Sequence, residues 1–320
     1  MTGRAGAAAG AGALAGAGAD RWRLEIVAPG DRLEPLLDLL DEGAEAVSWF
    51  ATGATGAAGA TGAGGAGGWR VEAIYEDEVA ARSAATRARD TGLVGGGATV
   101  GPLAGRDWLA RNRRSFRPIR AGRFLVRPTT WQGPAPTGGV VLHLDAGPAF
   151  GSGSHETTRG CLLAMDRLAR RRVRPGCVLD MGCGSGILAI AAARRWRVPV
   201  LAVDIDPVAT ATTAENAARN GVARLVRTAT GDGWRTAAVR RDGPFDLVMA
   251  NILAAPLRRM APDLARGLAP GGEAVLSGLL RGQASAVAGA CRAAGLAVAG
   301  RLILGDWAVL VVTRPSGSRA

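Results

Sequence analysis

The residues best suited to chemistry begin with a glycine loop at residues 178–186, which read VLDMGCGSG. A buried apolar run ends at Asp180 and leads into Gly182, Gly184 and Gly186, after which a helical pattern begins. Glycine lets the backbone approach a ligand closely, and the free N–H groups of a first helical turn point at it. This order predicts a nucleotide-binding turn, with Asp180, Gly182 and Gly184 as candidate cofactor contacts.

Three further polar residues follow later predicted strands. Asp204 lies about 20 residues after the first glycine, where a carboxylate can hydrogen-bond both hydroxyls of a ribose; a solvated loop carboxylate is the alternative. Asp232 is placed to accept a hydrogen bond from an adenine amino group, with Trp234 over the ring; a turn aspartate and a packing tryptophan are the alternatives. Asn251 ends a strand at the edge where such sheets bind ligands.

A loop rich in glycine and serine, AFGSGSHETT, occupies residues 149–158 and precedes a predicted helix. Thr157 and Thr158 stand at the start of that helix, where hydroxyl and N–H groups can bind an anion such as a carboxylate, or simply cap the helix. His155 is a candidate proton acceptor near neutral pH, or a loop histidine that positions the backbone.

The elements that must position these residues alternate between strand and helix from residue 140 to the C-terminus. This alternation predicts an open, mostly parallel, doubly wound sheet whose last strand is antiparallel. Earlier in the chain, the patterns predict a small α/β sandwich of ferredoxin-like type, with strands at residues 22–28, 46–50 and 69–75 and helices at residues 32–41 and 79–89.

The composition suggests how these parts are divided. We expect a disordered Ala/Gly tail at residues 1–19, a small α/β domain at 20–105 with a flexible Ala/Gly/Thr insertion at 51–68, a linker at 106–130 and a catalytic domain at 131–320. The linker alternates arginines with aromatic residues, so an RNA-binding surface is the alternative for it.

The net charge of +12 comes from arginine alone, because the 320-residue chain contains no lysine. The abundance of Ala, Gly and Arg points to a coding bias, so the charge argues little for nucleic acid, although it suits an anionic ribonucleoprotein surface. Four cysteines without a C-x-x-C spacing predict reduced thiols, no metal site and a cytoplasmic protein. No apolar run is long enough to span a membrane.

The loop spacing is G-x-G-x-G, since Ile187 stands where a dinucleotide motif needs its third glycine. With Asp180, it resembles the first motif of S-adenosylmethionine (SAM)-dependent methyltransferases. Taken with the blocks AFGSGSHETT, AVDIDPVA and ANILAAPLRRMAPDLA, the chain from about Asp107 onward resembles the ribosomal protein L-eleven methyltransferase (PrmA-type) family. The resemblance implies an α/β Rossmann-like class I methyltransferase sheet with a small N-terminal ferredoxin-like domain.

The resemblance also implies a function. SAM contacts fall on Thr158, Gly182, Asp204 and Asn251, and the N-terminal domain recognises ribosomal protein L-eleven, free or on the large subunit. The resemblance further implies that methyl groups go to lysine side-chain amines and the α-amine. Apart from the resemblance, the Asn251 side-chain oxygen can hold an amine N–H and His155 can accept a proton, so both are candidate catalytic residues. No dedicated nucleic-acid motif and no membrane partner are expected.

Three alternatives differ in class. A methyltransferase acting on rRNA or a small molecule is favoured by the charge but by no motif. An NAD-dependent dehydrogenase would share Asp204 but needs the later glycine. A non-enzymatic ribosome-associated module would need no complete cofactor pocket, whereas the polar residues of such a pocket are present.

Overall fold

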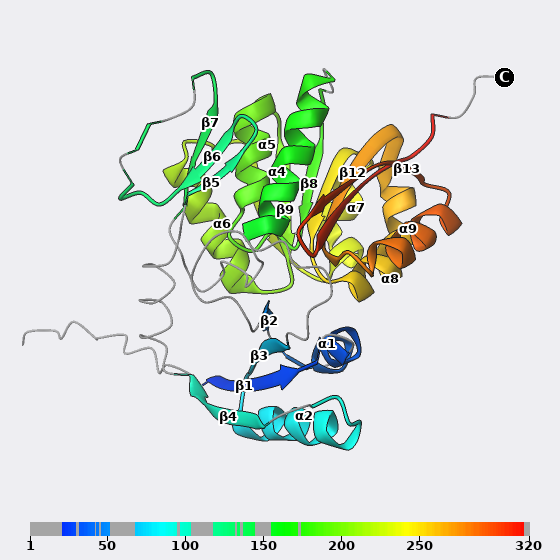
Figure 1. Cartoon of the computed structure of the whole chain (residues 1–320). Coiled ribbons are helices and arrows are strands. Elements are labelled where there is room, and N and C mark those ends of the chain that lie inside the picture. Colours follow the sequence, from blue (N-terminus) through cyan, green and yellow to red (C-terminus); the bar gives the residue numbers. More distant parts are fainter. Residues whose placement is uncertain are drawn as a thin grey trace, which may run out of the picture.

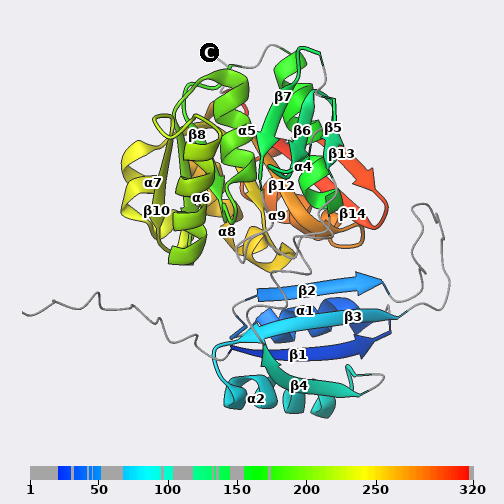
Figure 2. The same ribbon diagram turned by 90° about the vertical axis from the view of Figure 1, so that its left-hand side faces the viewer.

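The computed structural model describes residues 21–29, 32–41, 43–44, 46–51, 68–94, 97–103, 118–131, 133–134, 137–144, 155–171 and 174–316. These residues form a small N-terminal α/β unit and a larger α/β unit that carries a second, short sheet (Figures 1 and 2). The expected tail at residues 1–19 and nearly all of the expected insertion at 51–68 lie outside the described residues.

The N-terminal unit runs through β1 (Arg21–Ala28), α1 (Leu33–Asp41), β2 (Ala46–Ala51), β3 (Trp69–Tyr75), α2 (Glu78–Asp90) and β4 (Ala98–Leu103). Its strands pair in the order β2-β3-β1-β4, all antiparallel. This order matches the ferredoxin-like arrangement expected from the sequence. The fourth strand was not among the predicted ones, because its sequence ATVGPL includes a glycine and a proline, which disfavour strands.

Leucines of α1 and alanines of α2 bury against the strands of this unit. Leu36 and Leu40 are fully buried, as are Leu24 and Ile26 of β1. Leu280 and Trp307 of the larger unit, which pair with each other across two neighbouring antiparallel strands, belong to the same apolar cluster. The N-terminal unit therefore packs against the larger one through a shared apolar contact.

The larger unit is a doubly wound sheet in the strand order β10-β9-β8-β11-β12-β14-β13. The chain passes through β8 (Val178–Met181), α5 (Ile187–Trp196), β9 (Val200–Asp204), α6 (Pro207–Arg219), β10 (Val226–Thr230), the short η2 (Gly233–Arg235), α7 (Ala237–Asp242), β11 (Phe245–Asn251), α8 (Ala254–Gly267), β12 (Leu268–Leu280), α9 (Ala284–Ala293), β13 (Ala297–Leu304) and β14 (Trp307–Thr313). Among these strands only β14 runs opposite to the others, as the sequence predicted.

Successive side chains of each central strand point to opposite faces of this sheet, where they meet different helices. In β11, Leu247 and Met249 join a core with α4 (His155–Arg170) and α5, whereas Val248 and Ala250 join a core with α8 and α9. Both faces are therefore dry, which explains why these strands read as continuous apolar runs.

A short sheet of β5 (Ile119–Ala121), β6 (Phe124–Arg127) and β7 (Val140–His143) lies against α4 and α5. Phe124 and Val126 of β6 are buried in the same core as α4. Part of the range expected as a linker, residues 118–130, thus contains two strands packed on the catalytic unit, while residues 104–117 lie outside the described part. Where the domain boundary falls stays a prediction.

Candidate functional site

The glycine loop between β8 and α5 takes a backbone conformation that glycine favours. Gly182, Gly184 and Gly186 have φ angles of +72°, +52° and +79°. The amides of Gly182 and Cys183 both donate to the carbonyl of Val203, at 2.8 and 3.0 Å. A Cβ atom at position 182 would lie 2.4 Å from Ile252 Cγ2, so the loop is held closely between the ends of β9 and β11.

Asp180 is the buried support of this loop. Its carboxylate Oδ2 accepts a hydrogen bond from the amide of Ala189 at 2.8 Å, and it thereby takes the role of a cap for α5. Gly186, at the N-cap position, provides no side chain for that purpose. The Asp180 side chain is 1% exposed, so a direct contact with a cofactor, predicted from the sequence, stays a prediction.

Burial raises the pKa of Asp180 to about 7, because desolvation penalises the charged form; the Ala189 amide acts against this and the charge of Asp204 adds to it. The two carboxylates thus lie under and beside the same loop. Their mutual repulsion is reduced whenever Asp180 holds a proton.

Asp204 stands at the carboxyl end of β9, beside the glycine loop. Its Oδ2 accepts from the Gly184 amide at 2.9 Å, and its Oδ1 accepts from the Asp206 amide at 3.1 Å. These bonds hold the half-buried carboxylate at the edge of the sheet, and each oxygen retains a second lone pair. The next side chain, Ile205, is 73% exposed, so an uncovered apolar surface adjoins the carboxylate.

Asn251 ends β11 and contacts the start of α4. Its Nδ2 donates to Thr157 Oγ1 at 3.4 Å, and Ser277 Oγ of β12 donates to the Thr157 carbonyl at 3.3 Å. The Oδ1 atom of Asn251 is buried and has no hydrogen-bond partner within the described residues. A buried acceptor without a partner is costly, so this oxygen is suited to receive a donor from a ligand.

The two threonines at the start of α4 differ in what they contact. Thr157, which is 1% exposed, carries the contacts to Asn251 and Ser277, whereas the predicted cofactor ligand Thr158 is 8% exposed. His155 is the first residue of α4, but its side chain and residues 145–154 lie outside what the structure describes. The role of His155 as a proton acceptor therefore stays a prediction.

The predicted adenine contacts lie near the end of β10. Asp232 has an exposed side chain that forms an ion pair with Arg235 at 3.2 Å. Trp234 packs edge-on against Phe245, with ring centroids 6.3 Å apart, and a Cβ atom at Gly267 would overlap its ring. Of the two interpretations of Trp234, packing is the one that matches its surroundings.

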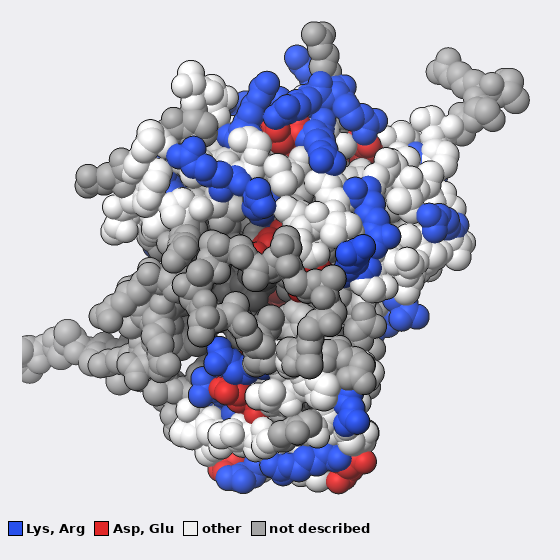
Figure 3. Space-filling view, viewed as in Figure 1, with Lys and Arg blue, Asp and Glu red and all other residues white. Residues whose placement is uncertain are grey.

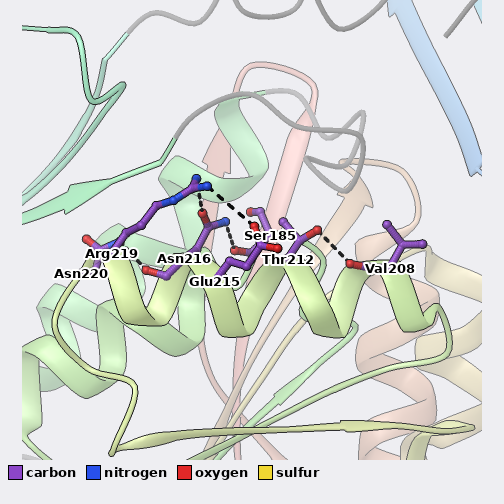
Figure 4. A network of polar contacts seen from close by, with 7 residues as sticks. All are labelled: Ser185, Val208, Thr212, Glu215, Asn216, Arg219 and Asn220. Atoms are coloured by element: carbon purple, nitrogen blue, oxygen red, sulfur yellow. Dashed lines mark hydrogen bonds and ion pairs between the residues drawn. The ribbon is translucent and has the colours of Figure 1, made fainter. Parts of the chain in front are cut away.

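Three polar residues of α6 lie behind the site and were not predicted from the sequence. Thr213, Asn216 and Asn220 are 0%, 3% and 3% exposed, and each bonds to backbone near the site. Figure 4 shows Asn216 reaching to Ser185 of the glycine loop. The signal was available, because positions 213, 216 and 220 recur on one face of a helix where apolar residues are expected.

A family model described as ribosomal protein L11 methyltransferase (PrmA) matches residues 22–315. A ribosomal protein L11 methyltransferase of Rhizobium etli (strain CIAT 652) is 42% identical over 264 residues, which cover 82% of this chain and 88% of that protein. This chain belongs to the PrmA family.

Two further relatives support the assignment to the PrmA family. A protein of the same name from another Rhizobium etli strain (CFN 42) is 51% identical over 178 residues, which cover 55% of this chain and 60% of that protein. The crystal structure of a ribosomal protein L11 methylase from Lactobacillus delbrueckii subsp. bulgaricus has a TM-score of 0.55 at 30% identity and covers 62% of this chain and 98% of its own. The resemblance and the Rossmann-like fold expected from the sequence are thereby confirmed.

Membrane-spanning helices and groups of metal-binding side chains are both absent from the described residues. No helix there is long and apolar enough to cross a membrane. Nor does that part of the chain contain a group of three or more His, Cys, Asp or Glu residues that could hold a metal ion.

The pKa of Asp180 gives a first prediction. The pKa of Asp180 is higher in the folded state than in the unfolded one. The free energy of unfolding of the protein therefore falls as pH rises between these two pKa values, from about 4 to about 7. Asp180→Asn removes this loss. Urea unfolding at about pH 5 and about pH 8 should show the variant gaining stability relative to wild type at the higher pH. A constant difference would contradict the assignment.

Proposed function

We propose that this member of the PrmA family transfers methyl groups from SAM to amines of ribosomal protein L11. One arrangement supports this function above all. The glycine loop, the Asp204 carboxylate and the partnerless Asn251 Oδ1 converge at the carboxyl ends of β8, β9 and β11, where doubly wound sheets bind ligands. The names of the relatives point to the same protein substrate.

The residues at this edge fit the parts of SAM. The Asp204 carboxylate can accept hydrogen bonds from both ribose hydroxyls through its remaining lone pairs. The exposed Ile205 offers an apolar surface for a flat heterocycle, and Asp232 offers a carboxylate for an adenine amino group. Thr158 and Asn251 adjoin the start of α4, where a helix N-terminus favours the carboxylate of an amino acid.

The chemistry asked of the chain is modest. SAM, when bound, supplies a methyl group on a positively charged sulfonium, so alignment and exclusion of water account for much of the rate. The attacking amine of the substrate must be neutral, because a protonated amine has no free lone pair. The ordinary pKa of lysine is about 10.4, so the chain must help to remove the proton. Asn251 Oδ1 is a buried acceptor for one N–H of that amine, which fixes the direction of the nitrogen lone pair. His155 is the candidate to take up the proton.

The amines are those of lysine side chains and the α-amino group of L11, in a cytoplasmic setting. An rRNA substrate is the second possibility, since arginines spread over the viewed surface and crowd at the end far from the N-terminal unit (Figure 3). Some of this charge is already paired: Arg170 and Arg171 bind Asp166 and Glu273 at 2.7 and 2.9 Å. The protein substrate is therefore the better supported.

Incubation with labelled SAM and either purified ribosomal proteins or rRNA tests the proposal. Label should appear in L11, and tandem mass spectrometry should locate it on lysine side chains and the α-amine. Label found only in RNA would remove the protein-substrate assignment.

The ribose assignment predicts a strong effect of Asp204→Ala on SAM binding. Loss of a charged acceptor for two hydroxyls should raise the Kd for SAM by about 10- to 100-fold in calorimetric titration. Asp206→Ala is the matched control, because that carboxylate accepts from the Val208 amide at 2.7 Å and caps α6. Its Kd should stay near the wild-type value. Equal affinities in all three proteins would refute the ribose contact.

The acceptor assignment predicts that Asn251→Ala lowers kcat for L11 methylation by about 10- to 100-fold, through loss of one positioned hydrogen bond. Ser277→Ala serves as the control. Ser277 is buried, pairs with Asn251 from the neighbouring strand β12 and donates to the Thr157 carbonyl, so its hydroxyl is already engaged. It should keep kcat within about threefold of wild type. An Asn251→Ala enzyme with normal kcat would show that the amine is held elsewhere.

A further inference from the structure

One face of α6 carries a series of buried polar side chains, at Thr213, Asn216 and Asn220. Burying a hydroxyl or a carboxamide stabilises nothing unless its hydrogen bonds are made, and apolar residues would fill the same space at less cost. Their partners therefore indicate what these side chains do.

Thr213 and Asn216 bond to the backbone of the glycine loop. Thr213 Oγ1 lies 3.0 Å from the Gly184 carbonyl and 3.3 Å from Cys183 Sγ, and Asn216 Nδ2 donates to the Ser185 carbonyl at 2.9 Å. A Cβ atom at Gly186 would lie 2.8 Å from the Thr213 hydroxyl, so the loop and this side chain are in close contact. The carbonyls of Gly184 and Ser185 are thus held by hydrogen bonds from α6.

Asn220 bonds to a different segment. Its Nδ2 donates to the His143 carbonyl at 2.7 Å and to the Asn216 carbonyl at 2.8 Å, while its Oδ1 accepts from the His143 amide at 2.8 Å. The carboxamide therefore binds the end of β7 through both backbone groups of one residue. From His143 the chain continues through residues 145–154 to α4, which carries Thr157 and Thr158.

We propose that Thr213 and Asn220 are positioning residues for cofactor binding, and that α6 holds the glycine loop and the end of β7 in a fixed relation. The inference rests on the SAM site proposed above. Neither side chain needs to touch SAM. When their bonds are lost, the binding-competent arrangement is less populated, and the apparent Kd rises by the same factor.

A matched pair of neighbouring threonines tests the proposal. Thr213→Val keeps the shape but removes the hydroxyl, and it should raise the Kd for SAM about five- to tenfold in calorimetric titration. Thr212→Val is the same change one residue earlier, where the hydroxyl is exposed and donates to the Val208 carbonyl of its own helix (Figure 4). It should leave the Kd within about twofold. Thr213→Ser keeps the hydroxyl and should bind SAM with nearly the wild-type Kd.

Asn220→Asp tests the second contact. A carboxylate would face the carbonyls of His143 and Asn216 in place of a donor, so the Kd for SAM should rise by at least as much as in Thr213→Val. If Thr213→Val does not fold, Asn220→Asp decides the question alone. Thermal melting without ligand is measured in parallel, because a purely structural role lowers the melting temperature and leaves the Kd unchanged.

The possible failures differ. Folded Thr213→Val and Asn220→Asp proteins that bind SAM as tightly as wild type would overturn the positioning role and leave the cofactor site intact. A wild-type protein that does not bind SAM would overturn the proposed cofactor and, with it, the inference about α6.

Discussion

The structure of the site depends on the hydrogen bond from the Gly184 amide to the Asp204 carboxylate, 2.9 Å long. It joins the glycine loop after β8 to the end of β9, while the Val203 carbonyl accepts the amides of Gly182 and Cys183. Three positions of this loop are glycines at positive φ, so they have no side chains with which to hold the loop in place. The neighbouring strand therefore sets the loop and keeps the carboxylate turned toward it.

Two sets of buried side chains support this contact. Asp180 precedes the loop and caps α5 through the Ala189 amide, and Thr213 and Asn216 of α6 bind the carbonyls of Gly184 and Ser185. Neither support needs to touch a ligand. Because the loop is fixed before binding, little ordering remains to be done when the cofactor arrives, which favours affinity. Asn251 Oδ1, in contrast, has no hydrogen-bond partner among the described residues, as expected of an atom that accepts a hydrogen bond from a ligand.

Much of this was predictable from the sequence, since local signals determined it. The glycine spacing, Asp204 at the end of its strand and Asn251 at the end of β11 follow from apolar runs that end in polar residues. The strands β4, β5 and β6 were not predicted. β5 and β6 are only three and four residues long, and β4, which contains a glycine and a proline, forms by pairing with the distant β1. Thr213, Asn216 and Asn220 were missed because a polar residue on a helix usually faces solvent. Their spacing places them on the face expected to be buried, but only the tertiary contacts show what they bind.

The central claim is that the residues at the carboxyl ends of β8, β9 and β11 bind SAM and that Asn251 Oδ1 accepts a hydrogen bond from the attacking amine. A crystal structure of the protein with S-adenosylhomocysteine and a lysine-containing L11 peptide tests it most directly. We expect the ribose hydroxyls within hydrogen-bond distance of the Asp204 carboxylate and a substrate amine donating to Asn251 Oδ1. A ligand bound away from Asp204, or an amine held by other groups while Asn251 Oδ1 keeps no partner, would contradict the account.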